Sequence, residues 1–169
     1  SLALYGRGKN TIVEFIGHVM YEDSVTTQTA DHGTYYRTGD RWEARGNVAT
    51  QNRKDRSTIL GPSLDYLRAV PGVRDTLELF AVGRPTIRSF PRDTGVTKPE
   101  PYVIVADRVR MKGTDRTWGG GRVTVDRSDF SARGDSLYLD SGTANEGRLL
   151  GTPMMKGLGR DFFELHGRR

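Results

Sequence analysis

Gly121-Arg122-Val123 opens one predicted strand, and Gly134-Asp135, with Tyr138 beyond it, marks the next. The same order of a Gly-x-Val opening, a small residue with an aspartate nearby and often a tyrosine occurs twice more. The earlier copies are Gly17-His18-Val19 with Ala30-Asp31 and Tyr35, and Gly46-Asn47-Val48 with Gly61 and Asp65-Tyr66. Such a repeat indicates one small β unit stacked on copies of itself, because each unit exposes an apolar face that only a neighbour can cover. We therefore expect a β-stack whose function lies along the stack.

Period-two alternation of apolar residues is frequent in the chain, whereas helical periodicity is almost absent. Pairs that share a strand face include Leu77 with Leu79, Val103 with Val105, and Leu137 with Leu139. Polar or glycine-containing turns separate such pairs at intervals of roughly eight to twelve residues, the spacing of sandwiches, jelly rolls and solenoids. The segment 63–69 fits a strand followed by a turn, because Pro71-Gly72 comes next. The pattern predicts an all-β protein.

The chain is expected to form one domain over residues 1–169. Only 35% of its residues are hydrophobic and 21 are glycine, which predicts a thin, turn-rich core. The segment 84–101 holds four of the seven prolines and is expected to be an irregular loop, not a linker, because the repeat resumes after it. The chain begins at Ser1 without Met, so a fragment of a longer protein is an open alternative. The longest apolar run, 102–106, is too short to cross a bilayer.

The charge is +5, with 26 basic residues of which only five are lysine. An arginine-rich surface suits phosphates, which belong to nucleic acid, lipid headgroups or glycolipids, although an ordinary solvated surface accounts for it as well. The arginines are spread along the chain among acidic residues, which argues against nucleic acid. The absence of cysteine excludes disulfides and thiolate metal sites.

Catalytic patterns are sparse. There are three histidines, and neither Gly-x-Ser-x-Gly nor His-Glu-x-x-His occurs. The nearest metal candidate joins His18 with Asp31 and His32, but alternation turns His18 outward. Recurring aspartates at equivalent positions (Asp31, Asp65, Asp107 and Asp135) indicate a structural role. We therefore expect no enzyme activity, no cofactor and no metal.

The succession of motifs resembles the OstA-like family of lipopolysaccharide-transport proteins, whose members include LptA, LptC and the N-terminal domain of LptD. In that family each repeat reads roughly as a strand, "G-N-V", a strand, "A-D-x-x-x-Y", a strand and "G-x-P". The resemblance covers about residues 11–165. The motifs that carry it are Gly46-Asn47-Val48, Ala106-Asp107-x-Val109, Gly121-x-Val123, Gly134-Asp135-x-x-Tyr138 and Leu149-Leu150-Gly151-x-Pro153.

The resemblance implies an antiparallel β-jellyroll, or β-taco, in which two sheets form a V around an apolar trough for acyl chains. It implies a non-enzymatic periplasmic protein that binds lipopolysaccharide and forms part of a bridge between the inner and outer membranes. It also implies partners of the same fold, or further copies of this chain, joined head to tail by their edge strands. The first strand would be Thr11 to Met20 and the last Arg160 to Leu165.

Fourteen apolar residues are expected to face inward and to contact lipid, and Asn47, Ala106 and Tyr138 are expected to face outward. The inward set is Phe15, Val19, Val25, Val48, Ile59, Leu64, Leu77, Leu79, Val105, Val109, Val123, Phe130, Leu137 and Leu139. Burial of one acyl chain contributes about 0.8 kcal/mol per methylene. Two alternatives stay open: a structural or adhesive β module with a closed core, and a polysaccharide-acting β enzyme with paired carboxylates on an exposed face.

Overall fold

The computed structural model describes residues 1–90, 99–159 and 164–167. This part of the chain is all-β: it contains fourteen strands and one short 3-10 helix at Gly8–Asn10. Every strand pairs with its neighbours in the antiparallel sense. No helix in the described ranges is long and apolar enough to span a membrane.

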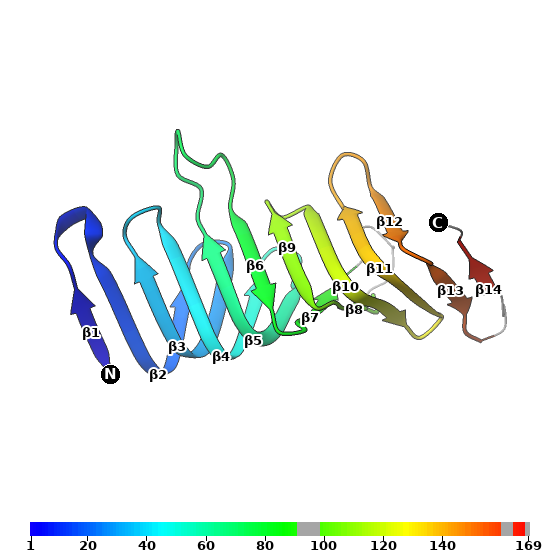
Figure 1. Cartoon of the computed structure of the whole chain (residues 1–169), viewed down its shortest axis with the longest axis horizontal. Coiled ribbons are helices and arrows are strands. Elements are labelled where there is room, and N and C mark those ends of the chain that lie inside the picture. The colour runs from blue at the N-terminus through cyan, green and yellow to red at the C-terminus, as the bar shows by residue number, and fades with distance from the viewer. Residues whose placement is uncertain (91–98, 160–163, 168–169) are drawn as a thin grey trace.

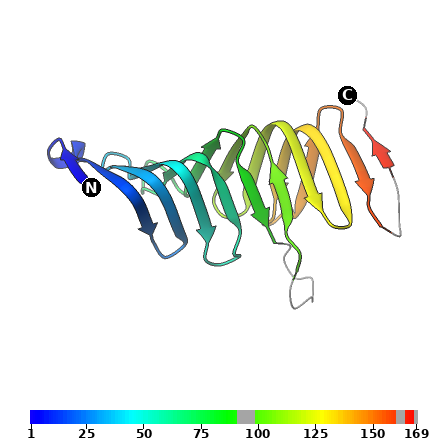
Figure 2. The ribbon, with the colours of Figure 1, turned by 90° about the horizontal axis from the view of Figure 1, so that it is seen from below.

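The strands lie side by side along the long axis, nearly in chain order, with the two termini at opposite ends (Figures 1 and 2). Their bounds are β1 Leu2–Tyr5, β2 Ile12–Glu22, β3 Thr26–Tyr36, β4 Arg41–Asn52, β5 Thr58–Leu67, β6 Glu78–Val82, β7 Thr86–Ser89, β8 Tyr102–Val105, β9 Arg108–Lys112, β10 Arg116–Arg127, β11 Phe130–Asp140, β12 Glu146–Leu150, β13 Met154–Gly157 and β14 Glu164–His166.

The long strands bend near their middles, so each contributes to two facing layers (Figure 1). We call these layers arm A and arm B. Arm A contains β1, β6, β9, β12 and the halves 12–16, 32–36, 41–45, 63–67, 116–120 and 136–140. Arm B contains β7, β8, β13, β14 and the halves 19–22, 26–29, 48–51, 58–60, 123–127 and 130–133.

Six strands pair in a closed ring, in the order β5-β6-β9-β10-β8-β7 and back to β5. The ring closes because β6 continues through a corner into β7, and β8 continues through a corner into β9. β5 pairs with both β6 and β7, and β10 pairs with both β8 and β9. The other strands extend this six-stranded barrel in both directions along the molecule (Figure 2).

The repeated Gly-x pairs lie at the corners. Five corner pairs have two consecutive residues with positive φ, beginning at Gly17, Gly46, Gly83, Gly121 and Gly151, and a sixth such pair, Gly39-Asp40, lies in the turn between β3 and β4. Glycine is the default residue in this left-handed region because it has no Cβ to clash. A Cβ on Gly121 would lie 2.5 Å from Oδ2 of Asp107 on the neighbouring strand. Asp107 belongs to the second kind of strand, in which the corner carries alanine or glycine before aspartate or, in β5, glycine before Pro62.

The alternation of core-facing side chains across the corner differs between the two kinds of strand. A Gly-x strand keeps period two through the corner, so Ala44 and Val48 both face the core. An aspartate strand advances by three, because Ala106 and Val109 are both buried while Asp107 points away. The expectation for Val105 and Ala106 is therefore wrong: Ile104 and Ala106 are buried, and Val105 between them points to the opposite face.

Three predicted boundaries also change. The segment 84–101 is not entirely irregular, because 86–89 form β7, which pairs with β5 and β8; residues 91–98 lie outside the described residues. The expected first strand, Thr11 to Met20, is the second strand, because β1 pairs with its first half. The expected last strand overlaps β14 at 164–165, and 160–163 lie outside the described ranges. The strand expected after residue 63 is confirmed by β5.

Candidate functional site: a divided apolar interior

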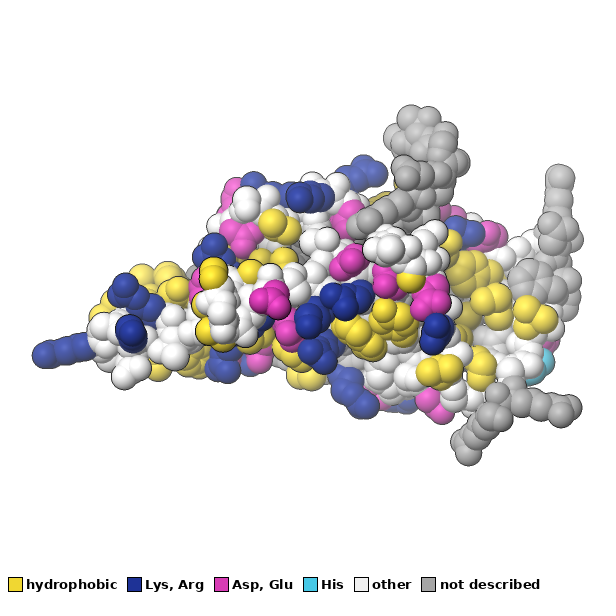
Figure 3. Space-filling model, turned by 90° about the horizontal axis from the view of Figure 1, so that it is seen from above, with side chains coloured by type: hydrophobic (Ala, Val, Ile, Leu, Met, Phe, Trp, Pro, Cys, Tyr) yellow, Lys and Arg dark blue, Asp and Glu magenta, His cyan; other side chains and the backbone are white. Residues whose placement is uncertain are grey.

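The space between the arms is lined mainly by apolar side chains and varies in width along the molecule. The cavity volumes, in order along the stack, are about 240 Å³ at the N-terminal end, 40 and 60 Å³ in the middle, and 300 Å³ near the C-terminal end. On the face of the molecule seen from above in Figure 3, hydrophobic side chains are exposed between the charged ones. The interior is therefore wide at its two ends and closely packed at its centre.

The cavity near the C-terminal end, which we call the C-terminal chamber, lies between β8, β10 and β11 and the strands after them. Nine of its twelve lining residues are hydrophobic, and its volume lies at the lower end of the range of small-molecule sites. The hydrophobic lining consists of Tyr102, Ile104, Val125, Phe130, Ala132, Leu137, Leu139, Leu149 and Met155. It is the largest apolar cavity among those described here, and it suits a hydrocarbon group.

A cation stands beside aromatic rings at this chamber. The Arg127 guanidinium lies 4.6 Å from the ring centroid of Tyr102 and 5.4 Å from that of Phe130. It donates to the Tyr102 hydroxyl at 2.9 Å and pairs with Asp129 at 2.5 Å. A charged group therefore lies next to the apolar lining, at the tip of arm B.

The cavity at the other end, the N-terminal chamber, is lined by aromatic residues. Its lining is Val13, Phe15, Tyr21, Tyr35, Asp40, Trp42 and Arg68. Tyr35 donates to Asp40 at 3.1 Å, and Arg68 pairs with the same carboxylate at 3.5 Å. Burial, followed by the bond to Asp40, raises the pKa of Tyr35. One oppositely charged pair therefore accompanies four aromatic rings here.

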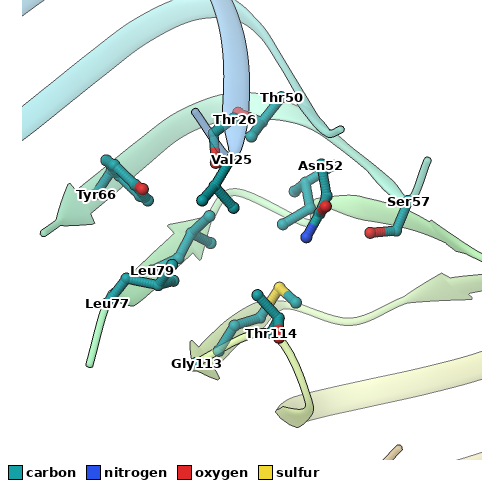
Figure 4. Close-up of a pocket in the computed structure, with 12 residues that line it drawn as sticks. Val25, Thr26, Thr50, Asn52, Ser57, Tyr66, Leu77, Leu79, Gly113 and Thr114 are labelled. Carbon is teal, nitrogen blue, oxygen red and sulfur yellow. The ribbon is translucent and has the colours of Figure 1, made fainter. Parts of the chain in front are cut away.

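The centre of the interior is narrow and partly polar (Figure 4). The 40 Å³ cavity is lined by Thr26, Thr50, Asn52 and Ser57 from arm B as well as by apolar residues including Tyr66 and Leu79. Beside it, the buried Gln28 amide donates to the Thr50 hydroxyl at 2.8 Å. A space of this size holds a water molecule but not a hydrocarbon chain.

Three of the four recurring aspartates, Asp31, Asp107 and Asp135, contact the corners. The expectation that Asp65 holds an equivalent position is wrong, because it lies within arm A and pairs with Arg45 at 2.7 Å. Asp107 accepts hydrogen bonds from Arg122 at 2.7 Å and from Arg84 at 3.0 Å, and the Arg122 bond is the main reason that its pKa is lowered. Asp31 accepts from the Asn47 amide at 2.7 Å. The described residues bring together no group of three metal-ligating side chains. The carboxylates at the corners are occupied in holding neighbouring strands at the bend.

Eight of the fourteen candidate lipid-contacting residues are buried in the core: Val19, Val48, Ile59, Leu64, Leu79, Val109, Val123 and Leu137. Three more, Phe15, Leu77 and Leu139, are partly buried against it. Val25 lines the 40 Å³ cavity and Phe130 lines the C-terminal chamber, whereas Val105 faces away. Those that line an interior cavity lie in different ones: Phe15 in the N-terminal chamber, four in the 40 Å³ cavity, and Phe130, Leu137 and Leu139 in the C-terminal chamber. Val48, Leu64, Val109 and Val123 line none of the described cavities.

The sequence patterns missed several residues of the two chambers. Tyr21, Trp42, Tyr102, Ile104 and Leu149 line them. Strand alternation finds Ile104 once the three-residue step at Ala106-Asp107 is known. No local signal marks Trp42, which packs over Gly33 of the adjacent strand.

Comparison with known proteins gives no assignment to set beside this geometry. No protein-family model matches the chain, and no curated protein sequence matches it.

Proposed function

We propose that this protein is a non-enzymatic carrier of an acylated glycolipid, with lipopolysaccharide as its ligand. The observation that carries the proposal is the C-terminal chamber, an apolar space of about 300 Å³ between two sheets with Arg127 beside it. Burial of each methylene contributes about 0.8 kcal/mol, so an apolar chamber binds acyl chains without any catalytic group. Arginine is suited to the phosphates of the sugar headgroup.

The bent strands support the finer assignment of the fold. Two facing layers joined at corners, with Gly-x corners on every second strand, support the β-taco that the resemblance to the OstA-like family implies. We propose this fold for the chain, together with a place in the periplasm as part of a bridge between the inner and outer membranes.

The ends of the stack support head-to-tail partnership with a second copy or a related β-jellyroll. At the N-terminal end β1 extends arm A, while residues 19–22 of arm B pair with β3 alone. At the C-terminal end β14 extends arm B, while β12 of arm A pairs with β11 alone among the described strands. When two copies meet head to tail, β1 of one copy thus lies next to β12 of the other in arm A, and β14 lies next to residues 19–22 in arm B. Unpaired strand edges readily pair with another strand.

The described parts of the two arms contain equal numbers of strands, which supports this head-to-tail pairing. Among the described residues each arm has ten strands or half-strands, so a copy added at either end continues both arms without a gap. The end strands also carry much of the exposed apolar surface. The large hydrophobic residues exposed there are Leu2, Leu4, Tyr5, Ile16 and Met20 at one end, and Leu150, Met155, Leu158 and Leu165 at the other.

A structural module with a closed core is the second candidate, and the closely packed centre favours it. Photo-crosslinking to lipopolysaccharide separates the two candidates. A benzoylphenylalanine probe replaces Leu139, which lines the C-terminal chamber. In the matched control it replaces Tyr138, the preceding residue on the same strand, whose ring packs at a tilt against Trp118. Adducts at 139 but not at 138 support the carrier, and adducts at neither position leave the structural module.

A further inference from the structure

One carboxylate near the N-terminal chamber collects four hydrogen bonds. Asp23 lies in the turn between β2 and β3, and its Oδ1 accepts from the backbone amides of Val25 at 2.8 Å and Thr26 at 2.7 Å. Its Oδ2 accepts from the hydroxyls of Tyr21 at 3.1 Å and Tyr66 at 3.2 Å. Burial acts to raise the pKa of Asp23, but these four bonds outweigh it and lower that pKa overall.

The bond from Tyr66 differs from the other three because it joins the two arms. Tyr21, Val25 and Thr26 belong to the same end of arm B as Asp23, whereas Tyr66 lies on β5 in arm A, paired with Trp42 and Leu79. The Tyr66 side chain is almost fully buried, and burial is the main reason that its pKa is raised to about 12. The hydroxyl therefore stays protonated and available as a donor.

Aromatic rings form a wall at the same place. Ring centroids are 5.7 Å apart for Phe15 and Trp42, 5.3 Å for Trp42 and Tyr21, and 6.0 Å for Tyr21 and Tyr66. Phe15, Tyr21 and Trp42 line the N-terminal chamber, while Tyr66 lines the 40 Å³ cavity beyond it (Figure 4). The wall therefore separates the N-terminal chamber from the rest of the interior.

We propose that Asp23 and Tyr66 form a gate at the inner end of the N-terminal chamber, closed in this structure and released when the Tyr66–Asp23 hydrogen bond breaks. The inference rests on the proposed function for the identity of what passes. Loss of this bond frees Tyr66 of arm A from the end of arm B, while the Asp23 turn keeps its shape through the remaining three bonds. A hydrocarbon chain in the N-terminal chamber extends toward the centre of the interior only while the gate is open, because the closed cavity of about 40 Å³ behind Tyr66 is too small for it.

The opening of the arms is measurable without any lipid. Because the chain has no cysteine, cysteines introduced at the exposed Arg37 and Lys54 place two nitroxide labels at the tips of arm A and arm B. Double electron–electron resonance on the whole chain is expected to give one narrow distance distribution for the parent, and a broader, longer one for Tyr66→Phe. Tyr21→Phe is the matched control, because it removes a bond to the same carboxylate oxygen within one arm. Equal distributions for the parent and Tyr66→Phe overturn the gate.

A second variant keeps the test decisive if Tyr66→Phe does not fold. Asp23→Asn keeps an oxygen that accepts the backbone amides but replaces the charged acceptor of Tyr66, and it is expected to broaden the distribution as well. An unchanged distribution in Asp23→Asn, with the far-ultraviolet spectrum of the parent, overturns the proposal.

Movement of a chain across the gate is followed with radiolabelled palmitate. Benzoylphenylalanine replaces Tyr35 in the N-terminal chamber or Leu77 in the 40 Å³ cavity behind the gate. We expect adducts mainly at 35 in the parent and a rise of about tenfold in the rate of adduct formation at 77 with Tyr66→Phe, as for loss of one hydrogen bond to a charged group. Equal rates in the parent at both positions overturn the gate. Absence of adducts at both positions in every variant contradicts the carrier function, while the label distances still decide whether the arms open.

Discussion

A Cβ atom on Gly46 would lie 2.6 Å from Oδ2 of Asp31, the carboxylate that the adjacent Asn47 side chain also holds. The bend of β4 thus depends on a missing side chain on one strand and on a carboxylate of the next. Gly17 has the same left-handed backbone at the corner of β2, but an added Cβ there meets nothing within 4 Å. The two glycines separate the conformational requirement from the steric one.

Alanine at these two corners is expected to destabilise the protein unequally. Gly17→Ala is expected to lower the free energy of unfolding by about 1–2 kcal/mol, the cost of a left-handed non-glycine residue. Gly46→Ala adds a clash with Asp31, for which overpacking costs suggest about 1–3 kcal/mol more. Urea unfolding measures both values. Equal losses would show that Asp31 moves aside freely and does not hold the corner.

Acid is expected to weaken the protein through Asp23. Its pKa is lower in the folded state than in the unfolded chain, so its contribution to stability is complete above the ordinary aspartate pKa and is lost as the pH falls through the folded value. Urea unfolding at successive pH values from 7 down to about 2 should therefore show a loss beginning near pH 4. Asp23→Asn should reduce this loss. Asp126→Asn, at an exposed carboxylate that accepts one bond from Ser131, is the control and should leave it unchanged.

Replacement of two buried alanines by leucine is expected to change the stability of the protein to different extents. Ala132 lines the C-terminal chamber, so the added atoms of Ala132→Leu enter open space and should change stability by less than about 0.5 kcal/mol. Ala44 is fully buried in the core cluster, where Ala44→Leu should cost about 1–3 kcal/mol. Thermal and urea unfolding provide the comparison. A large loss in Ala132→Leu would mean that the chamber does not accept added volume, and it would weaken the case for a ligand there.

Palmitate affinity tests the same chamber independently of stability. Ala132→Leu fills part of the space, so its palmitate affinity is expected to fall about tenfold, a change equivalent to about 1.4 kcal/mol of binding free energy. Isothermal titration calorimetry with the parent and the variant measures the difference. An unchanged affinity would place the ligand elsewhere.

A lysine at an end strand is expected to weaken self-association. Met20 is 67% exposed on the open half of β2, and a charged residue at a strand edge disfavours pairing with another chain. Met20→Lys should therefore lower the weight-average mass in sedimentation velocity over a concentration series. Leu60→Lys changes a 44% exposed residue of β5, away from both ends, and should leave the mass of the parent. A similar fall in both variants would exclude the ends as the contact.

The sequence predicted the kind of structure well and the inward set almost completely. Short-range alternation is enough to place residues such as Leu79 and Leu137 in the core, because strands send successive side chains to opposite faces. Val105 failed because alternation was carried through Ala106-Asp107, where the corner adds a residue. The order β5-β6-β9-β10-β8-β7 was not predictable either, since it depends on which strands separated in sequence pair across the corners.

The division of the interior into separate cavities could not be predicted from the sequence. The gap between the arms at each point depends on the sizes of side chains that face one another across it, such as Tyr21 and Trp42, and these come from different strands. The hydrogen bond from Tyr66 to Asp23 spans 43 residues of sequence, and no local pattern indicates it. Buried polar residues such as Gln28 are also not distinguished from surface residues by the sequence. In the interior the Gln28 amide nitrogen donates to the Thr50 hydroxyl, while its amide oxygen has no partner among the described residues.

The alternation of corner types limits how a stack of this kind changes in length. Each Gly-x corner from β4 onward lies against a corner of the other type: Gly46 beside Asp31, Gly83 beside Pro62, Gly121 beside Asp107 and Gly151 beside Asp135. Gain or loss of a single bent strand would set two Gly-x corners next to each other and reverse the direction of every strand that follows. Gain or loss of a pair preserves both the corner contacts and the shapes of the two ends. The heritable unit of such a molecule is thus a hairpin of two bent strands, and relatives of different reach should differ by whole hairpins.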